Sequence, residues 1–288
     1  MAITLDPELV TRLVREALAE DRAADDATTL ALVTPGQRGR GDIVAKAPGV
    51  IAGLAFAQSA FRQVDAGILW RPATADGESV SPGDIVATVE GSLDGLLRAE
   101  RTALNFLTHL SGIATAAAAV VKLLEGTGCR LRDTRKTVPG LRLAEKYAAQ
   151  TGGAKTFRTD LADAVLIKDN HLAAVRGRGL GIPDAVRLAR ETNPGLRVEV
   201  EVTSIGEAGE AIESGASELL LDNMTPAEIR PIVELAASHD PRPLLEASGG
   251  ITAENAREYA EAGVDFVSIG AITHSATALD LSLDIKTA

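Results

Sequence analysis

The sequence predicts an α/β protein in which a β-rich N-terminal module is followed by a parallel β/α barrel. Residues 37–94 consist of short apolar runs separated by Pro-Gly and Gly-rich turns, which is typical of small antiparallel sheets. From residue 129 onward, apolar runs with polar ends alternate with helical stretches, and this alternation indicates βαβ units around a parallel sheet. At least six such units follow one another, so we expect the sheet to close into a barrel.

The composition favours an α/β enzyme with an aliphatic core. Of the 288 residues, 45% are hydrophobic and only 3% are aromatic. A net charge of −11 argues against a general nucleic-acid or anionic-membrane surface. No apolar run approaches the roughly 20 residues of a membrane span, and the N-terminus lacks a signal-peptide pattern. The lone Cys129 is expected to be a buried strand thiol and fits a reducing compartment, so we expect a cytoplasmic protein.

Helices are predicted at the N-terminus and between the two parts of the chain. Asp6-Pro7 is a typical N-cap followed by a proline at the first helical position, and apolar residues then recur at helical spacing. Residues 96–126 have a long helical periodicity that is interrupted near Ser111-Gly112, and we expect this segment to bridge two domains. Further helices are predicted at 182–193, 205–214, 226–238 and 253–262.

The predicted strands of the barrel end at polar residues or glycines, which we expect at the C-terminal mouth where functional groups of such barrels gather. These residues are Asp133, Arg135 and Lys136, then Lys168, Glu199 and Glu201, Asp222, Glu246 and Ser248, and finally Gly270 and His274.

Residues 130–168 carry a local excess of positive charge, with nine basic residues against four acidic ones. Arg135, Lys136 and Lys168 follow predicted strands, so we expect them to bind anions such as carboxylates or phosphates. Arg142 and Lys146 lie on the helix expected after Gly140, where a solvated surface explains them.

Two carboxylates, Glu201 and Asp222, end neighbouring predicted strands and should face the same mouth. They could hold the hydroxyls of a ribose or the water shell of Mg²⁺, which binds through one or two carboxylates plus substrate phosphate. The alternative is that they form ion pairs with Lys168 or Arg135.

Glycine-rich loops at 248–252 and 269–275 follow the last two predicted strands. Backbone N–H groups at these positions commonly bind phosphate in a β/α barrel, although plain tight turns are the alternative. His274 either neighbours the phosphate or caps a helix, and His109 and His239 are interpreted as structural or surface residues. Nucleophile triads, metal-binding histidine clusters and nucleotide-binding glycine motifs are missing from the sequence, so positioning and electrostatics are expected to carry the chemistry.

Several short sequence segments together resemble those of the quinolinate phosphoribosyltransferases, also called carboxylating nicotinate-nucleotide pyrophosphorylases. The resemblance rests on "AERTALNFLTHLSGIAT" (99–115), "DTRKT" (133–137), "PGLR" with "EKYA" (139–148), "LIKDNH" (166–171), "EVEV" (199–202), "LLLDNM" (219–224), "SGG" (248–250) and "GVDFVSIGAITHS" (263–275).

The resemblance implies a two-domain homodimer with shared active sites. Residues 1–110, joined by 276–288, would form an open α/β sandwich, and residues 111–275 an incomplete α/β barrel with the active site. Enzymes of this family convert quinolinate and phosphoribosyl pyrophosphate, with Mg²⁺, into nicotinate mononucleotide, pyrophosphate and CO₂ for NAD biosynthesis.

The resemblance also implies roles for single residues. Arg101 resembles an arginine that reaches the neighbouring subunit's site, and Arg135, Arg158 and Lys168 resemble the groups that bind the quinolinate carboxylates. The residues that match the family's other site positions are Lys136 for pyrophosphate, Glu201 and Asp222 for the ribose and for Mg²⁺ through water, and Ser248, Gly249, Gly250, Gly270 and His274 for the phosphate end.

One segment departs from the family pattern. Where the family usually has Gly-Gly-Gly-x-Asn-His-Arg, this chain reads "GGAKTFR" (152–158), so Thr156 replaces the asparagine and Phe157 the histidine that helps to hold the dicarboxylate. Because a phenyl ring cannot donate a hydrogen bond to a carboxylate, three alternatives stay open. In the first, Lys155 compensates for the lost hydrogen bond and quinolinate is the acceptor. In the second, the chain is a paralogous enzyme that uses another aromatic acid, which could stack on Phe157. In the third, the chain is a catalytically idle binding protein.

Overall fold

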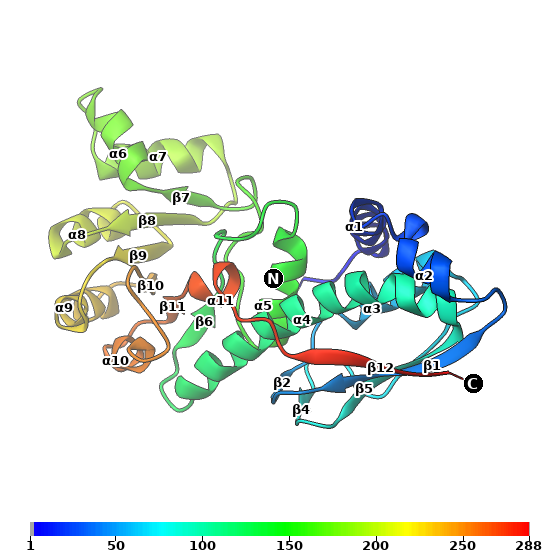
Figure 1. The fold of residues 1–288 in the computed structure, drawn as a ribbon. Coiled ribbons are helices and arrows are strands. Elements are labelled where there is room, and N and C mark those ends of the chain that lie inside the picture. The colour runs from blue at the N-terminus through cyan, green and yellow to red at the C-terminus, as the bar shows by residue number, and fades with distance from the viewer. Residues whose placement is uncertain (1–2, 288) are drawn as a thin grey trace. The chain divides into compact units, whose positions relative to one another are not determined.

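The computed structural model describes residues 3–287, which form two compact units (Figure 1). The sandwich unit contains the chain up to Ala118, the segment Pro139–Gly153 and the chain from Ser275. The barrel unit contains Ala119–Val138 and Ala154–His274. Residues 139–153, which lie inside the range expected for the barrel domain, thus pack with the sandwich unit. The predicted fold class, an incomplete parallel β/α barrel with an α/β sandwich, is confirmed.

The sandwich unit is built on an antiparallel sheet with the strand order β12-β1-β5-β3. The strands are β1 (Arg38–Ala45), β3 (Leu69–Pro72), β5 (Ile85–Ser92) and β12 (Leu281–Thr287), and a separate short ribbon joins β2 (Gly49–Val50) to β4 (Ser79–Val80). The last strand of the chain pairs with β1 over its whole length, from Gly39 opposite Thr287 to Ala45 opposite Leu281. The C-terminal residues are therefore part of this sheet.

Helix α4 (Leu93–Leu123) runs along one face of this sheet (Figure 1), and its residues from Ala119 onward belong to the barrel unit. The other helices of the sandwich unit are α1 (Pro7–Glu20), the 3₁₀ helix Ala23–Asp25, α2 (Ala27–Leu32), α3 (Leu54–Val64) and α5 (Arg142–Thr151). The predicted start of α1 is confirmed, because the Asp6 carboxylate accepts a hydrogen bond from Glu8 N at 3.0 Å and Pro7 is the first helical residue. Its buried residues Val10, Leu13 and Val14 share one side, and α1 packs against α3.

Helix α3 was not predicted within the β-rich module at 37–94. The apolar run at 50–55 forms only the end of β2 before the chain turns at Gly53, which has φ +97°, and becomes helical. The Asp76 carboxylate accepts hydrogen bonds from Gly53 N at 3.0 Å and Leu54 N at 3.1 Å. This carboxylate caps the helix from 22 residues away, so the local sequence lacks the usual N-cap signal.

Helix α4 is continuous through Ser111 and Gly112, so the predicted interruption there is wrong. Gly112 is needed for a close approach rather than for a break, because a Cβ at this position would lie 2.2 Å from the Thr277 carbonyl oxygen. Ser111 is buried, and its hydroxyl accepts a hydrogen bond from Ala52 N at 3.0 Å. Small residues thus let the backbone pack tightly against the middle of the helix.

Helix α4 also corrects the expectation that no apolar run approaches the length of a membrane span. Its 31 residues include an 18-residue window with a mean hydropathy of 1.5, so by length and composition the helix could cross a membrane. Half of that window is buried inside the protein, and a core helix meets the same criteria. The helix therefore carries no argument for a membrane-spanning segment.

The barrel unit contains a parallel sheet with the strand order β6-β11-β10-β9-β8-β7. The strands are β6 (Arg130–Arg132), β7 (Val165–Ile167), β8 (Val198–Val202), β9 (Glu218–Asp222), β10 (Leu244–Ser248) and β11 (Phe266–Ser268). The helices are α6 (Asp169–Arg176), α7 (Ile182–Thr192), α8 (Ile205–Glu213), α9 (Pro226–Ala237), α10 (Ala256–Glu261) and α11 (Ala271–His274). Cys129, directly before β6, is buried as predicted, and burial raises the pKa of its thiol to about 12.

An irregular segment extends the sheet next to β6. Lys155 forms an isolated parallel bridge with Arg132, Asp133 N donates to Lys155 O at 2.9 Å, and Lys155 N donates to Leu131 O at 2.8 Å. Residues 154–158, which contain the departure from the family pattern, therefore run alongside β6 like a further strand of the barrel.

The close approach at Gly112 leads to a stability prediction. We expect Gly112→Ala to lower the free energy of unfolding by about 1–3 kcal/mol, because a methyl group has no room against the Thr277 carbonyl. Urea denaturation followed by circular dichroism measures the change. Gly209→Ala is the matched control, since its Cβ would meet its nearest atom, Leu235 Cδ2, only at 3.9 Å, and this change inside α8 should stabilise the protein by about 0.5–1 kcal/mol. Equal effects of the two changes would contradict the prediction.

Candidate functional site

The predicted site residues of the barrel unit lie at or just after the C-terminal ends of its strands. Glu201 and Asp222 lie in the last two positions of β8 and β9, Ser248 ends β10, and Lys168 and Gly270 follow β7 and β11 closely. Asp222 and Ser248 are direct register partners. Because all of these strands are parallel, their C-terminal ends meet at one edge of the sheet, which we call the mouth.

Lys168 and Glu201 form an ion pair at the mouth. Lys168 Nζ lies 2.8 Å from Glu201 Oε2, and Asp169 N donates a hydrogen bond to Oε1 at 3.3 Å. Glu201 is buried, whereas about half of the Lys168 side chain is exposed. His171 Nδ1 accepts a hydrogen bond from Lys168 N at 2.9 Å and thereby fixes the start of α6. The ion pairing considered as an alternative for Glu201 is thus present, and it leaves the Lys168 amine directed to the mouth.

Asp222 is held in place by the residue that follows it. Asn223 Nδ2 donates to Asp222 Oδ2 at 2.7 Å, and Asn223 N donates to Ser248 O at 2.8 Å. Gly249 has φ +90°, and a Cβ there would lie 2.3 Å from Asn223 Oδ1, so only glycine fits. Among the residues that the structure describes, Asp222 Oδ1 has no hydrogen-bond partner. A carboxylate with one available oxygen fits Mg²⁺ bound through water and substrate phosphate.

Lys136, Gly270 and His274 form the opposite part of the mouth. A Cβ at Gly270 would lie 2.8 Å from Lys136 Cδ and 3.2 Å from His274 Nε2, so both side chains pass over this glycine. The Thr273 hydroxyl donates to Lys136 O at 2.7 Å and connects α11 to the loop after β6. Gly250 has φ +63°, and a Cβ there would meet no atom within 4 Å, so its backbone is accessible.

Arg135 and Arg158 form no ion pair with a carboxylate among the described residues, and their positive charges repel each other. Arg158 is 8% exposed, and the pKa of its guanidinium is lowered, first by burial and then by the positive charge of Arg135. Arg158 Nη1 donates to Ala164 O at 3.4 Å, whereas the buried Nε of Arg135 has no hydrogen-bond partner among the described residues. Glu199, Asp163 and Asp160 oppose this shift, and a bound anion would reduce the repulsion between the two guanidiniums further. Since neither arginine has an ion-pair partner among the described residues, this pair is the part of the barrel best suited to a carboxylate ligand.

The remaining predicted site residue, Arg101, is exposed on α4 in the sandwich unit. The role that the resemblance gives it stays a prediction. Lys146 differs from its prediction, because it is buried in α5 rather than solvated. His109 is structural as predicted, since its Nε2 lies 2.9 Å from the buried carboxylate of Glu145.

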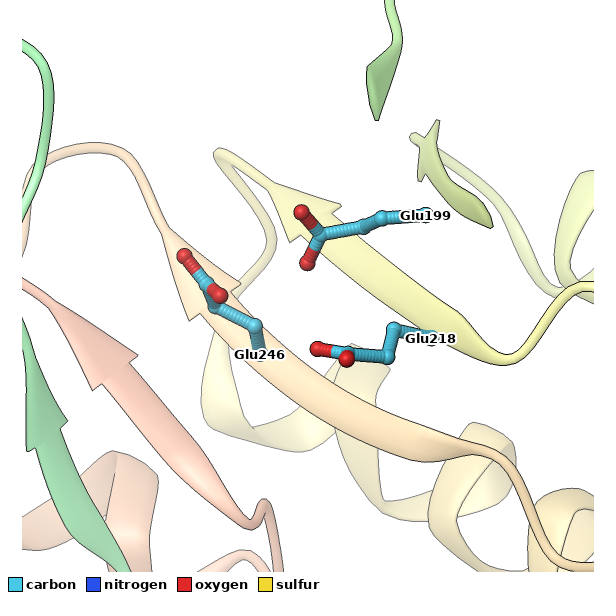
Figure 2. A group of neighbouring side chains, drawn as sticks. All are labelled: Glu199, Glu218 and Glu246. Atoms are coloured by element: carbon cyan, nitrogen blue, oxygen red, sulfur yellow. The ribbon is translucent and has the colours of Figure 1, made fainter. Parts of the chain in front are cut away.

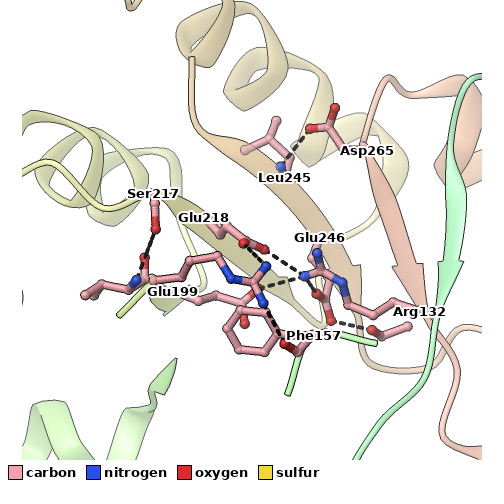
Figure 3. Close-up of polar contacts among 11 residues, drawn as sticks. Arg132, Phe157, Glu199, Ser217, Glu218, Leu245, Glu246 and Asp265 are labelled. Carbon is pink, nitrogen blue, oxygen red and sulfur yellow. Dashed lines mark hydrogen bonds and ion pairs between the residues drawn. The ribbon is translucent and has the colours of Figure 1, made fainter. Parts of the chain in front are cut away.

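Below the mouth lies a buried charge cluster, and Glu199 and Glu246, which were expected at the mouth, belong to this cluster instead. Glu199, Glu218 and Glu246 project from β8, β9 and β10 toward one another, with ligand oxygens within 4.8 Å (Figure 2). Arg132 Nη1 contacts all three carboxylates, at 2.9 Å for Glu218, at 3.6 Å for Glu199 and in a short contact for Glu246 (Figure 3). The guanidinium therefore supplies the cation of this cluster and takes the place that a metal ion would need.

The sequence carried a signal for this cluster. Glutamates at alternate positions of "VEVEV" predict charges on one face of a buried strand, and the same face of β8 carries Glu199 in the cluster and Glu201 at the mouth. Arg132 at the end of "RLR" is their counter-charge. The pairing could not be predicted because the partners come from four different strands.

Glu199 is the most perturbed member of the cluster. Its pKa is raised well above the ordinary value of 4.5, mainly because burial removes its hydration and further because of the negative charge of Glu246. Arg132 opposes this shift without cancelling it.

Thr156 and Phe157, the two residues that depart from the family pattern, lie next to this cluster. The Thr156 hydroxyl donates to Asp133 Oδ2 at 2.6 Å, and both residues are buried. Phe157 is 8% exposed, and the guanidinium carbons of Arg197 and Arg132 lie 4.8 and 5.1 Å from its ring centroid. The ring that was considered as a stacking surface for an acceptor is thus in contact with protein cations.

Comparison with known proteins gives consistent results for both parts of the chain. The model of the quinolinate phosphoribosyl transferase N-terminal domain matches residues 26–111, and that of the C-terminal domain matches residues 113–284. A nicotinate-nucleotide pyrophosphorylase (carboxylating) of Mycobacterium leprae is 42% identical over 277 residues, which are 94% of this chain and 95% of that protein. The human protein of the same name is 40% identical and covers 99% of this chain and 94% of its own length.

A solved structure agrees with these relatives. The nicotinate-nucleotide pyrophosphorylase of Francisella tularensis superimposes with a TM-score of 0.93 at 37% identity and covers 99% of this chain and 98% of its own. The likeness therefore extends over both units.

The raised pKa of Glu199 leads to a prediction on pH dependence. The folded protein holds this proton more tightly than the unfolded chain, so this group destabilises the fold progressively as the pH rises above about 4.5. We expect Glu199→Gln to gain stability relative to the wild type progressively as the pH rises above about 4.5, as measured by urea denaturation.

Glu228→Gln is the control for this experiment. The pKa of Glu228 is lowered, first by the backbone N–H of Thr225 in the capping box of α9, so its stabilisation is lost only below about pH 4.5. Its effect should stay constant between about pH 5 and about pH 8. A constant difference for Glu199→Gln over the same window would contradict the prediction.

Proposed function

Because the chain belongs to the quinolinate phosphoribosyltransferase family, we propose that it is a pentosyltransferase that converts quinolinate and phosphoribosyl pyrophosphate into nicotinate mononucleotide, pyrophosphate and CO₂. This reaction belongs to NAD biosynthesis. The observation that carries the proposal is the set of polar groups in the barrel: Arg135 and Arg158 have no ion-pair partner among the described residues, and two carboxylates and two glycine loops lie at the strand ends of the mouth. A dicarboxylate and a polyphosphate need such a combination.

The dicarboxylate is assigned to Arg135, Arg158 and Lys168. Burial strengthens the interaction of Arg158 with an anion, and a bound carboxylate would relieve its repulsion by Arg135. Lys168 already has one carboxylate partner in Glu201 and adds a third positive charge to the pocket. These contacts would fix the plane of the pyridine ring and so direct its nitrogen.

Phosphoribosyl pyrophosphate is assigned to the loops on the other side of the mouth. Lys136 and His274 pass over Gly270 and would contact pyrophosphate oxygens. The backbone of Gly249 and Gly250, which lies in left-handed conformations, offers N–H groups to the 5′-phosphate together with Ser248.

Asp222 and Glu201 would hold Mg²⁺ through water, and the ion would neutralise the charge of the departing pyrophosphate. The open oxygen of Asp222 supports this assignment. The same carboxylates favour the positive charge that develops at the anomeric carbon of the ribose.

The proposed chemistry requires no covalent enzyme intermediate. The lone pair of the pyridine nitrogen forms the bond to C1 of the ribose while the C1–O bond breaks and its electron pair leaves with pyrophosphate. The resulting pyridinium then withdraws the electron pair of the bond between C2 and its carboxylate, CO₂ leaves, and C2 takes up a proton. The protein supplies orientation and electrostatic stabilisation.

We further propose a cytoplasmic homodimer in which Arg101 of one subunit completes the site of the other. The exposure of Arg101 on α4 supports this proposal, because an arginine that acts in a neighbouring subunit must be accessible. A different acceptor and a catalytically idle protein are not favoured, since the relatives named above carry the name of the carboxylating enzyme along their whole length.

The reaction itself is tested with the purified protein. We expect quinolinate labelled in its 2-carboxylate, with phosphoribosyl pyrophosphate and Mg²⁺, to release pyrophosphate and labelled CO₂ in equal amounts. A chelator should abolish both, because the ion neutralises the leaving group. Nicotinate, which lacks the 2-carboxylate, is the matched control acceptor and should react poorly. Lack of turnover with quinolinate, or preference for nicotinate, would contradict the proposed function.

The shared site is tested by complementation. Arg101→Ala and Lys168→Ala should each lose most activity as homodimers. When the two inactive proteins are unfolded, mixed in equal amounts and refolded together, half of the dimers are mixed and each mixed dimer has one intact site. We therefore expect about a quarter of the wild-type activity. If no activity returns, Arg101 acts in its own subunit or the protein is not a dimer, and gel filtration distinguishes the two cases.

A further inference from the structure

The side chain of Phe157 contacts the end of the barrel that lies opposite the mouth. Arg197, whose guanidinium lies 4.8 Å from the ring, directly precedes β8. Its ion-pair partner Glu218 is the first residue of β9, four residues before Asp222. Since each residue advances a strand by about 3.3 Å, Glu218 and Asp222 are separated by most of the height of the sheet. The ring is therefore directed to the floor of the barrel, which we define as Arg132, Arg197, Glu199, Glu218 and Glu246.

Phe157 is fixed to this floor through both its ring and its backbone. Arg197 Nη2 donates to Phe157 O at 2.6 Å, and Arg197 Nη1 donates to Glu218 Oε1 at 2.8 Å. Glu218 Oε2 accepts in turn from Arg132 Nη1 at 2.9 Å, and Arg132 lies 5.1 Å from the same ring (Figure 3). The ring thus contacts two guanidiniums that share one carboxylate, an arrangement that favours an aromatic face and would repel a protonated imidazole.

The next residue along the chain is Arg158, the desolvated arginine assigned to the dicarboxylate. Arg158 itself has one weak hydrogen bond, to Ala164 O at 3.4 Å, and its guanidinium carbon lies 6.0 Å from the Phe157 ring. On the preceding side, Thr156 is bonded to Asp133. Because few contacts hold Arg158 directly, the residue before it determines where its backbone lies.

We propose that Phe157 is a positioning residue that anchors segment 154–158 to the barrel floor through Arg197 and Arg132, and so places Arg158 for the acceptor dicarboxylate without contacting the acceptor. The inference rests on the proposed function for the identity of the acceptor. It also explains the departure from the family pattern as a change of support within the barrel, with Arg197 and Phe157 acting as a pair, rather than as a change of substrate.

The kinetic test compares Phe157→Leu with a matched control. Phe157→Leu keeps an apolar side chain but removes the ring face, and we expect the KM for quinolinate to rise about tenfold, the range of one lost hydrogen bond to a charged group, while kcat and the KM for phosphoribosyl pyrophosphate stay close to wild type. Phe266→Leu is the control. The guanidinium carbon of Arg132 also lies 3.7 Å from the centroid of the Phe266 ring, but Phe266 belongs to β11 and not to segment 154–158. It should leave the KM for quinolinate within about twofold of wild type.

A second variant covers the case in which Phe157→Leu does not fold. Arg197→Gln changes a half-exposed side chain and removes the hydrogen bond to Phe157 O, so we expect the same rise in the KM for quinolinate. The double variant should show no further rise, because both changes release the same anchor. Additive effects, or a fall in kcat with both KM values unchanged, would reduce Phe157 to a core residue and overturn the proposal.

Phe157→His separates the inference from the competing explanation. A histidine that faces the floor cannot reach the acceptor, so we expect no gain in kcat/KM for quinolinate. A gain of tenfold or more would place this side chain in the acceptor pocket and overturn the proposal.

A readout independent of turnover distinguishes failure of the inference from failure of the proposed function. In a double-mutant cycle of unfolding, Phe157→Leu and Arg197→Gln should be coupled by about two- to fivefold in the unfolding equilibrium constant, as for a cation–π contact. If the wild type does not turn over quinolinate, the proposed function fails, while this coupling still decides whether Phe157 is anchored by Arg197. Absence of coupling would overturn the inference even in an active enzyme.

Discussion

The barrel depends on the buried guanidinium of Arg132, which joins carboxylates from three neighbouring strands. Burying one arginine with Glu199, Glu218 and Glu246 is costly unless the charges balance and the geometry is good. Arg197 adds a second positive charge at Glu218, and burial together with the charge of Glu246 raises the pKa of Glu199. Two cations therefore offset negative charge of the three glutamates in this centre. Removal of any one partner would leave an uncompensated charge, so the cluster fixes the register of β8, β9 and β10.

The ion pairs of the floor explain how an acidic protein keeps other cations available in the barrel. On β8, Glu199 belongs to the floor and Glu201, two residues later, to the mouth, so the alternation of the strand separates the two charge groups. The carboxylates of the floor are used by Arg132 and Arg197, and none of them is paired with Arg135 or Arg158 in the structure's described residues. Arg135 and Arg158 are therefore without ion-pair partners among the described residues, although the chain as a whole carries −11.

The sequence predicted those features whose cause is local. The periodicities of α7, α8 and α9 and the N-cap at Asp6 depend on neighbours within one or two turns, and all of them were found. Helix α3 was missed because its cap, Asp76, lies far along the chain, and the continuity of α4 was missed because the reason for Gly112 is a carbonyl at Thr277. The strand-end residues of the site followed from the rules for parallel barrels, whereas the floor needed partners from four strands that no local pattern joins.

Phe157 shows why a motif can identify a family and still leave a residue's role open. A motif records which residue stands at a position, but the direction of its side chain is decided by the surroundings, here Arg197 and Glu218, which lie outside the segment 152–158. At the floor a phenyl ring is stabilised by cation–π contacts with two guanidiniums. An imidazole at the mouth would instead be stabilised by a hydrogen bond to a carboxylate. An exchange at one motif position therefore implies a new acceptor only if the side chain still reaches the ligand, and in this chain the contacts of the ring are with the protein.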